Sequence, residues 1–169
     1  MTMTLINWAG STANQKTTIA TRLINLYQNR AWGPQITVIV ARKNLDRANN
    51  FLIVDQVGSG GATRYDAAFL GGIRENTVGD ALVKYGYVVF EPIVRQSVAD
   101  KKAELIALAK FTIQRAIANG VSEIIWCFPD ESPIGAWLME RGLLSHTELR
   151  EGVTVTIYQE PASAAEAKL

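Results

Sequence analysis

Apolar and polar positions follow their clearest pattern in the second half of the chain. Residues 87–94 are dense in valine and aromatic side chains and predict a strand, which Pro92 must interrupt because proline has no N–H to donate. Residues 101–119 repeat apolar side chains at helical spacing, and Gly120 signals the end of that helix. Residues 123–128 are continuously apolar, as in a strand buried on both faces. A strand, a helix and a strand in this order predict a right-handed parallel crossover.

A short helix and a last strand follow this unit. Ser132-Pro133 predicts a helix start, since serine caps orphan N–H groups and proline fits the first turn, and Gly142 predicts its end. The alternating residues 153–158 predict the final strand. Residues 161–169, PASAAEAKL, are expected to be a flexible tail.

The first half of the chain is patterned more weakly. Residues 2–8 predict a short strand at a sheet edge, and residues 15–31 an amphipathic helix capped by Ser11 or Asn14. Residues 35–42, QITVIVAR, are rich in β-branched side chains and predict a buried strand.

Two more strands are expected before the central unit. They cover residues 51–57 and 65–73, with a bend or bulge at Gly71-Gly72. Residues 74–84 are polar and predict a connection. The chain therefore predicts a single α/β domain over residues 1–160 with a mixed sheet.

Composition excludes several classes of function. A net charge of +1 makes nucleic-acid binding unlikely. The single cysteine, Cys127, excludes an intrachain disulfide and a multi-cysteine zinc site, and we expect it to be an inert core residue. The single histidine, His146, is expected in a surface loop. No apolar run reaches membrane-spanning length and no signal peptide is apparent, so we expect a cytoplasmic protein without a membrane partner.

The order of elements over about residues 64–160 resembles the GNAT family of N-acetyltransferases. Two local features carry the resemblance further: AxxxG at residues 116–120, and WLMERGL at residues 137–143, which is similar to the family's short helix. The resemblance implies an α/β fold with a mixed, mostly antiparallel sheet, a central splayed parallel pair and flanking helices. It also implies acetyl-CoA as the cofactor, no metal, and an amine as the acceptor.

The resemblance also implies where acetyl-CoA binds. In the family, the pantetheine arm bonds to free backbone groups of the first splayed strand, which here means Ile93 and Val94. The pyrophosphate lies at the start of the long helix, where unpaired N–H groups and the positive helix end attract anions. Arg95, Lys101 and Lys102 are the basic residues at that place.

Glu91 is the candidate catalytic residue. It lies on the first splayed strand, where a carboxylate near the acceptor amine can act as a general base, directly or through water. The alternative is a solvent-facing strand residue that precedes Pro92 without a chemical role.

Two departures from the family's pattern bear on activity. The family's phosphate loop is rich in glycine, whereas no glycine lies between Tyr87 and Gly120, and Asp100 places a negative charge beside the expected pyrophosphate. Leu138 stands where the family often has a tyrosine that protonates the leaving thiolate.

Two functions therefore stay open at the level of the sequence. One is an acyl-CoA-dependent N-acyltransferase. The other is a catalytically inactive GNAT-fold protein that serves as a binding or assembly module, through a protein partner or as a homo-oligomer. The segment RQSVADKK, residues 95–102, resembles GNAT-like domains of tailed phages, some of them virion-associated, which implies a location in the host cytoplasm or the virion.

Overall fold

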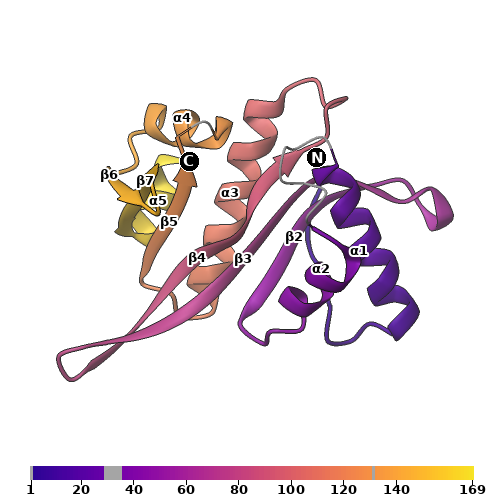
Figure 1. Ribbon diagram of the computed structural model, residues 1–169, viewed down its shortest axis with the longest axis horizontal. Helices are drawn as coiled ribbons and strands as arrows, with labels where there is room; N and C mark the ends of the chain where they lie inside the picture. The colour runs from indigo at the N-terminus through magenta and orange to yellow at the C-terminus, as the bar shows by residue number, and fades with distance from the viewer. Residues whose placement is uncertain (1, 29–35, 131) are drawn as a thin grey trace.

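A seven-stranded sheet with helices on both faces forms the body of the protein (Figure 1). The computed structural model describes residues 2–28, 36–130 and 132–169. The strands are β1 (Met3–Leu5), β2 (Asn50–Val57), β3 (Arg64–Val78), β4 (Ala81–Val94), β5 (Glu123–Pro129), β6 (Ser145–Arg150) and β7 (Val153–Pro161). The helices are α1 (Ala13–Tyr27), α2 (Val38–Leu45), α3 (Lys101–Ala118), α4 (Pro133–Glu140) and α5 (Ala162–Lys168), with a 3₁₀ turn, η2, at Gly60–Ala62.

The strand order is β1-β2-β3-β4-β5-β7-β6, and the described pairs are antiparallel except for the parallel pair β4–β5. This confirms the predicted fold class, including the edge position of the first strand. No helix in the described parts of the chain is long and apolar enough to cross a membrane.

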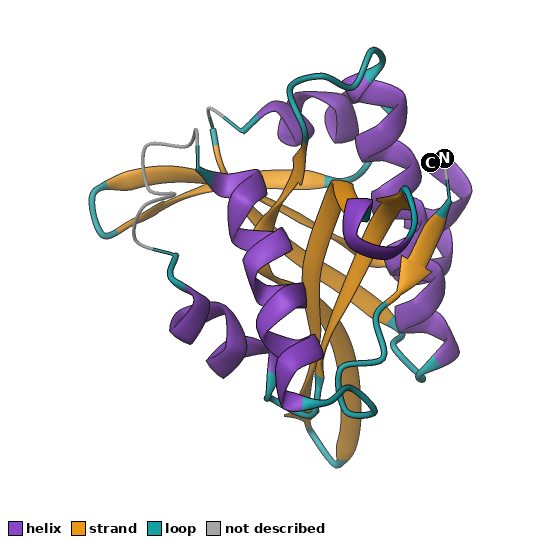
Figure 2. Cartoon of the chain, turned by 90° about the vertical axis from the view of Figure 1, so that its right-hand side faces the viewer, coloured by secondary structure: helices purple, strands orange, loops and turns teal. Residues whose placement is uncertain are grey.

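Helices lie on both faces of the sheet (Figure 2), and one apolar cluster on each face holds them there. Helices α3, α4 and α5 pack on one face around Trp126 and Phe128. Helices α1 and α2 pack on the other face, over β2, β3 and β4, around Leu23 and Leu70. The helices of this second face therefore cover the N-terminal half of the sheet, whereas β5 and β7 contribute no buried residue to that cluster.

Strand β4 is irregular at two places, one of which is at Pro92, as predicted. Phe90 pairs with Leu70 and Ile93 with Ala68, so Glu91 and Pro92 together face one residue of β3. A second extra residue of β4, Val89, lies just before Phe90. The bulge is thus in β4, opposite the step from Leu70 to Gly71, and not at Gly71-Gly72 of β3, where it was expected. Bulges bend a strand and increase its twist. The bends coincide with the stretch where β4 leaves its other neighbour, β5.

The strand expected over residues 35–42 is wrong, because α2 (Val38–Leu45) occupies most of that range; residue 35 lies outside the described residues. The Thr37 side chain accepts a hydrogen bond from the Val40 amide and caps the helix. Ala41 and Leu45, one helical turn apart, are buried in the apolar cluster around Leu23 and Leu70. Tertiary burial thus overrides the strand preference of a β-branched run.

The connection expected over residues 74–84 is also wrong. Strands β3 and β4 remain paired to Val78 and Ala81 and project as a long two-stranded arm (Figure 1). The turn at its tip uses Gly79 with φ +62°, a conformation that glycine adopts without steric cost. Polar composition was misleading here, because a two-stranded arm exposes both of its faces.

The C-terminal residues and His146 also differ from expectation. Residues 161–169 were expected to be a flexible tail, but Ala162–Lys168 form α5, whose Ala162 is buried against α3 and β5. Lys168 further binds the Glu160 carboxylate at 2.9 Å. His146 lies on β6, an edge strand that the sequence did not predict, because its residues are all exposed and show no apolar alternation.

The remaining elements agree with the prediction within a few residues. The first helix begins at Ala13, and Thr12 caps it in a reciprocal capping box with Gln15, in place of Ser11 or Asn14. Its predicted end at residue 31 lies outside the described residues.

A pair of buried carboxyl groups lies under the start of α3. Glu104 is only 4% exposed and Asp55, on β2, only 5% exposed. Burial, reinforced by the hydrogen bond and charge of Asp55, raises the pKa of Glu104 to about 8. Glu104 is therefore mostly protonated in the folded protein at neutral pH.

This pair predicts how stability depends on pH. The folded protein holds the Glu104 proton that the unfolded chain releases near its ordinary pKa of 4.5, so this contribution to stability is fully present below pH 4.5 and is lost as the pH rises to about 8. Glu104→Gln keeps a neutral hydrogen-bonding group, so it should raise the melting temperature by roughly 2–4 °C or more at pH 9 and hardly change it at pH 4.5. Thermal unfolding at both pH values tests this, with the exposed Glu151→Gln as the control. Equal effects at both pH values would contradict a protonated Glu104.

Candidate active site

The two central parallel strands pair at only two positions and then separate. Tyr85 pairs with Glu123 and Gly86 with Ile124, and no later pair joins β4 to β5. Two cavities, of about 380 and 340 Å³, lie along the separated strands and share Val88 as a lining residue. The edge of β4 that faces β5 beyond Gly86 therefore has backbone groups without a strand partner, which can bind a ligand.

Glu91 lies on the second of these cavities, at the bulge of β4. The hydroxyl of Ser132 donates to the Glu91 carboxylate at 2.5 Å, and Ser132 itself is only 4% exposed. On the other side of the residue, the Tyr27 hydroxyl of α1 donates to the Glu91 carbonyl oxygen at 2.5 Å. Glu91 is thus held from both sides of the gap, by α1 and by the segment that follows β5.

A third cavity, of about 460 Å³, lies where β4 ends and the loop to α3 begins. Ile93, Val94, Arg95 and Lys101 all line it, together with Asn25, Leu26, Gln96 and Ser97. The structure therefore brings four of the five predicted cofactor-binding residues to one cavity.

The two lysines of this region differ in placement. Lys101 lines the cavity, and its ammonium group donates to the Val98 carbonyl at 3.1 Å. Lys102 instead forms an ion pair with Glu140 of α4 and does not line the cavity. Of the two, only Lys101 is well placed to contact an anion there.

Arg95 is held rigidly at the wall of the same cavity. Its guanidinium donates twice to the Tyr65 carbonyl, at 3.1 and 2.8 Å, and lies 3.4 Å from the Asp66 carboxylate. The ion pair offsets part of the arginine charge, so Arg95 presents a fixed but partly neutralised cation.

The Asp100 side chain occupies the N-terminal end of α3. The Asp100 carboxylate accepts from the Ala103 amide at 3.0 Å, and the Asp100 carbonyl accepts from the Glu104 amide. Asp100, which the sequence led us to expect would repel an anion, is thus the N-cap of α3. A ligand phosphate at this end would bind beside Asp100, or would displace its side chain.

Other candidate residues contribute less. Leu138 of α4 is fully buried, and its side chain has no proton to donate to a leaving thiolate. Cys127 is half-buried on both cavities of the gap, and burial raises the pKa of its thiol, so the thiolate is scarce at neutral pH. His146 is an exposed residue 3.1 Å from Glu148. In the described residues, no group of three histidine, cysteine or acidic side chains is arranged to hold a metal ion.

Sequence reasoning missed two partners of Glu91, Ser132 and Tyr27. Ser132 does stand at the N-cap of α4, but its side chain makes no capping bond and binds Glu91 instead. Tyr27 belongs to the apolar stripe of α1, and its pattern is that of an ordinary core residue. Contacts separated by 41 and 64 positions in the chain have no local signal in the sequence.

No family model matches the chain, and no curated protein matches its sequence. Solved structures do match it. A chain in the crystal structure of the NatC complex bound to Gag peptide and CoA superposes with a TM-score of 0.66 and 11% identity, covering 95% of this chain and 99% of that one. The aminoglycoside 6'-N-acetyltransferase from Enterococcus faecium gives a TM-score of 0.67 at 9% identity, covering 96% and 97% of the two chains.

A putative acetyltransferase of the GNAT family from Desulfovibrio desulfuricans gives a TM-score of 0.65 at 11% identity, covering 95% of this chain and 99% of that one. At such identities the agreement concerns the fold. The chain has the fold of the GNAT acetyltransferases, which confirms the predicted resemblance at that level.

The bond from Tyr27 to the Glu91 carbonyl predicts a stability effect. Tyr27→Phe removes the donor and leaves a part-buried carbonyl with one partner fewer, so the free energy of unfolding should fall by about 1 kcal/mol. Urea denaturation measures this change. Tyr85→Phe, at a half-buried tyrosine of β4, is the control. An equal effect of both variants would mean that the Tyr27 bond contributes nothing specific.

Proposed function

We propose that this protein is an acyl-CoA-dependent N-acyltransferase that works in the gap between β4 and β5. The observation that carries the proposal is the separation of these strands after two pairs, with Glu91 fixed in the gap and a basic cavity at the end of β4. Proteins of this fold include acetyltransferases, and one solved relative in fold is bound to CoA.

The residues around the gap fit acyl-CoA in part. The free edge of β4 offers N–H and C=O groups to the amide-bearing pantetheine arm, with Ile93 and Val94 at its end. Lys101 and Arg95 would hold the pyrophosphate electrostatically. Asp100 opposes this binding, so the affinity should be lower than a glycine-rich loop would give.

The bound acyl-CoA would supply an activated acyl group as a thioester. Glu91 accepts a proton from the acceptor amine, which increases the nucleophilicity of the nitrogen. The nitrogen forms the new amide bond to the acyl carbon as the C–S bond of the thioester breaks, and the CoA thiolate leaves and takes a proton from water. Ser132 fixes the orientation of the Glu91 carboxylate by donating to one of its oxygens. Glu91 lies on β4 and Ser132 at the start of α4, so the distance between their side chains depends on how the two halves of the sheet pack together.

A second candidate function rests on the capped start of α3. Asp100 occupies the helix N-terminus and Lys102 is paired with Glu140, so two of the expected anion-binding features serve the fold itself. A GNAT-fold protein that keeps the scaffold without the chemistry, as a binding or assembly module of the kind some phage virions contain, would have this arrangement. Light scattering separates the two functions, since this alternative requires an oligomer or a stable protein partner.

Acetyl-CoA binding tests the first proposal directly. A ligand that binds only the folded state raises the melting temperature once it exceeds its dissociation constant. We expect millimolar acetyl-CoA to raise it, Lys101→Gln to abolish the shift, and Lys102→Gln to leave most of it, because only Lys101 lines the cavity. Absence of a shift in the wild-type protein at millimolar acetyl-CoA would exclude the enzyme.

Glu91→Gln tests the catalytic assignment. The amide cannot accept the proton, so kcat for acyl transfer should fall by about 10²–10⁴-fold, while the acetyl-CoA-induced shift in melting temperature stays unchanged. Ser132→Ala keeps the carboxylate but frees its orientation, so it should cause a smaller loss of kcat. Wild-type turnover in Glu91→Gln would show that another group takes the proton.

A further inference from the structure

A cavity of about 430 Å³ lies between α1 and the sheet. Helix α1 lines one wall, and the chain after β1 and the paired ends of β2 and β3 line the rest. It shares no lining residue with the three cavities described above. Its volume lies within the range of small-molecule sites, which is roughly 300–1,000 Å³.

Tyr65 of β3 forms the buried part of this cavity. Its side chain is fully buried in the apolar cluster beneath α1. The Tyr65 hydroxyl has no hydrogen-bond partner within the described residues. Because nearly all buried polar groups are hydrogen-bonded, this hydroxyl is a donor for which a ligand or a water can supply the acceptor.

Arg22 of α1 lies beside this tyrosine and lines the same cavity. Its guanidinium carbon is 6.0 Å from the centre of the Tyr65 ring. A guanidinium group has only donors, so Arg22 cannot accept the Tyr65 proton. Burial raises the pKa of Tyr65 by more than the Arg22 charge lowers it, so the hydroxyl keeps that proton at neutral pH. Two neighbouring groups therefore require the same kind of partner, a hydrogen-bond acceptor.

The charge of Arg22 is not offset by an acid. Arg22 is half-buried, and no described acidic side chain lies within ion-pair distance of its guanidinium. No aspartate or glutamate lines the cavity either. A cation in this setting favours an anionic ligand, because charge-assisted hydrogen bonds are the strong ones.

Two side-chain amides add further donors to the cavity. The Asn7 side-chain oxygen accepts from the Gly10 amide at 3.1 Å, and that of Gln15 accepts from the Thr12 amide at 2.7 Å. Since both oxygens are engaged with the backbone, the NH₂ groups are what these side chains offer to a ligand. The remaining polar wall consists of amides and hydroxyls, namely Ser11, Asn14, Thr18 and Gln56.

We propose that this cavity is a binding site for a small oxyanion ligand, a polar molecule whose carboxylate or phosphate group binds Arg22 and the Tyr65 hydroxyl. Asn7 and Gln15 donate to the same ligand. A carboxylate and a phosphate share the required chemistry, since guanidinium groups bind both in a planar, bidentate geometry. The site does not depend on the proposed acyl transfer, because none of the residues assigned to that reaction lines it.

Three probes of similar size that differ in charge test the site. Glucose 6-phosphate carries a phosphate, gluconate carries a carboxylate, and glucose is neutral. Isothermal titration calorimetry measures the binding of each to the full chain. We expect at least one charged probe to bind about ten-fold or more tightly than glucose, and more weakly as the salt concentration rises. The tighter of the two charged probes assigns the site to phosphate or to carboxylate.

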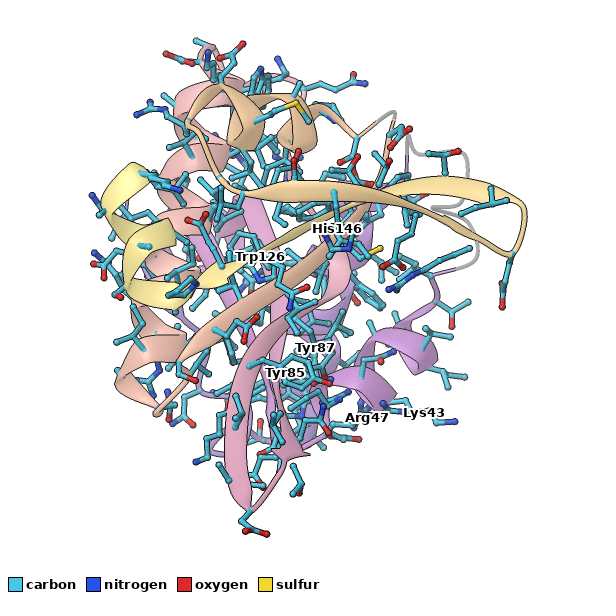
Figure 3. All side chains as sticks on the ribbon, turned by 90° about the vertical axis from the view of Figure 1, so that its left-hand side faces the viewer. Lys43, Arg47, Tyr85, Tyr87, Trp126 and His146 are labelled. Carbon is cyan, nitrogen blue, oxygen red and sulfur yellow. The ribbon has the colours of Figure 1, made fainter. Side chains whose placement is uncertain are left out.

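Variants of Arg22 locate the charge that the probes detect. Arg22→Gln should remove the preference for a charged probe. Arg22→Lys should keep part of it, because the ammonium group retains the charge but not the planar fork. The matched control is Arg47→Gln, at an exposed arginine near Tyr87 (Figure 3) that does not line this cavity, and it should change nothing.

Tyr65→Phe separates a contact with the ligand from a structural role. The hydroxyl has no partner in the described chain, so its removal should leave the melting temperature without ligand unchanged or slightly higher. Binding of the charged probe should weaken several-fold. A lower melting temperature without ligand would show that the hydroxyl serves the fold, and would contradict its role in the site.

The remaining outcomes decide whether the site exists and whether it is separate. Equal binding of all three probes, no binding of any at millimolar concentration, or a charge preference that persists in Arg22→Gln overturns the site. Acetyl-CoA should not displace the charged probe, and displacement would contradict a site apart from the proposed cofactor cavity. Failure of acetyl-CoA to bind contradicts only the acyl transfer, and a charged probe that still binds then supports this site.

Discussion

The separation of β4 from β5 is the constraint on which the candidate site depends. Two neighbouring parallel strands would normally pair along their whole length, because each unpaired backbone group costs free energy when it is buried. Here pairing stops after Gly86 and Ile124. Both bulges of β4 follow that point, and Pro92 lies in the second one, where its missing N–H costs no ladder bond.

The two faces of the sheet treat the gap differently: the apolar cluster on one face includes residues from both halves of the sheet, and Phe69 of β3 packs there against Trp126 of β5, whereas the cluster on the other face includes no buried residue of β5 or β7. One apolar cluster holds α3, α4 and α5, and the other holds α1 and α2. One polar contact also crosses the gap, from Ser132 to the Glu91 carboxylate, and Tyr27 of α1 binds the backbone carbonyl of the same residue within the β4 half. The fold therefore orients the Glu91 carboxylate, as the proposed general base requires.

Much of this arrangement could be predicted from the sequence, and the limits have physical causes. The strand–helix–strand unit, Pro92 and the glycine signal at Gly120 are local features, and the structure confirms them. Residues 38–45 form a helix against their β-branched composition, because burial of one helical face outweighs local preference.

The site shows the same division between local and distant information. The sequence pointed to basic residues near the start of the long helix, and a cavity does lie there. Sequence alone could not show that Lys101 lines this cavity whereas Lys102 pairs with Glu140, 38 positions away in the chain.

Hydrogen exchange of the β4 amides tests the central claim most directly. If the edge of β4 in the gap binds acyl-CoA, saturating CoA should slow exchange at amides between Val88 and Val94 that face β5, and should leave the amides paired with β3 unchanged. Unchanged exchange along that edge at millimolar CoA would contradict the account, because the gap would then be a structural feature without a ligand.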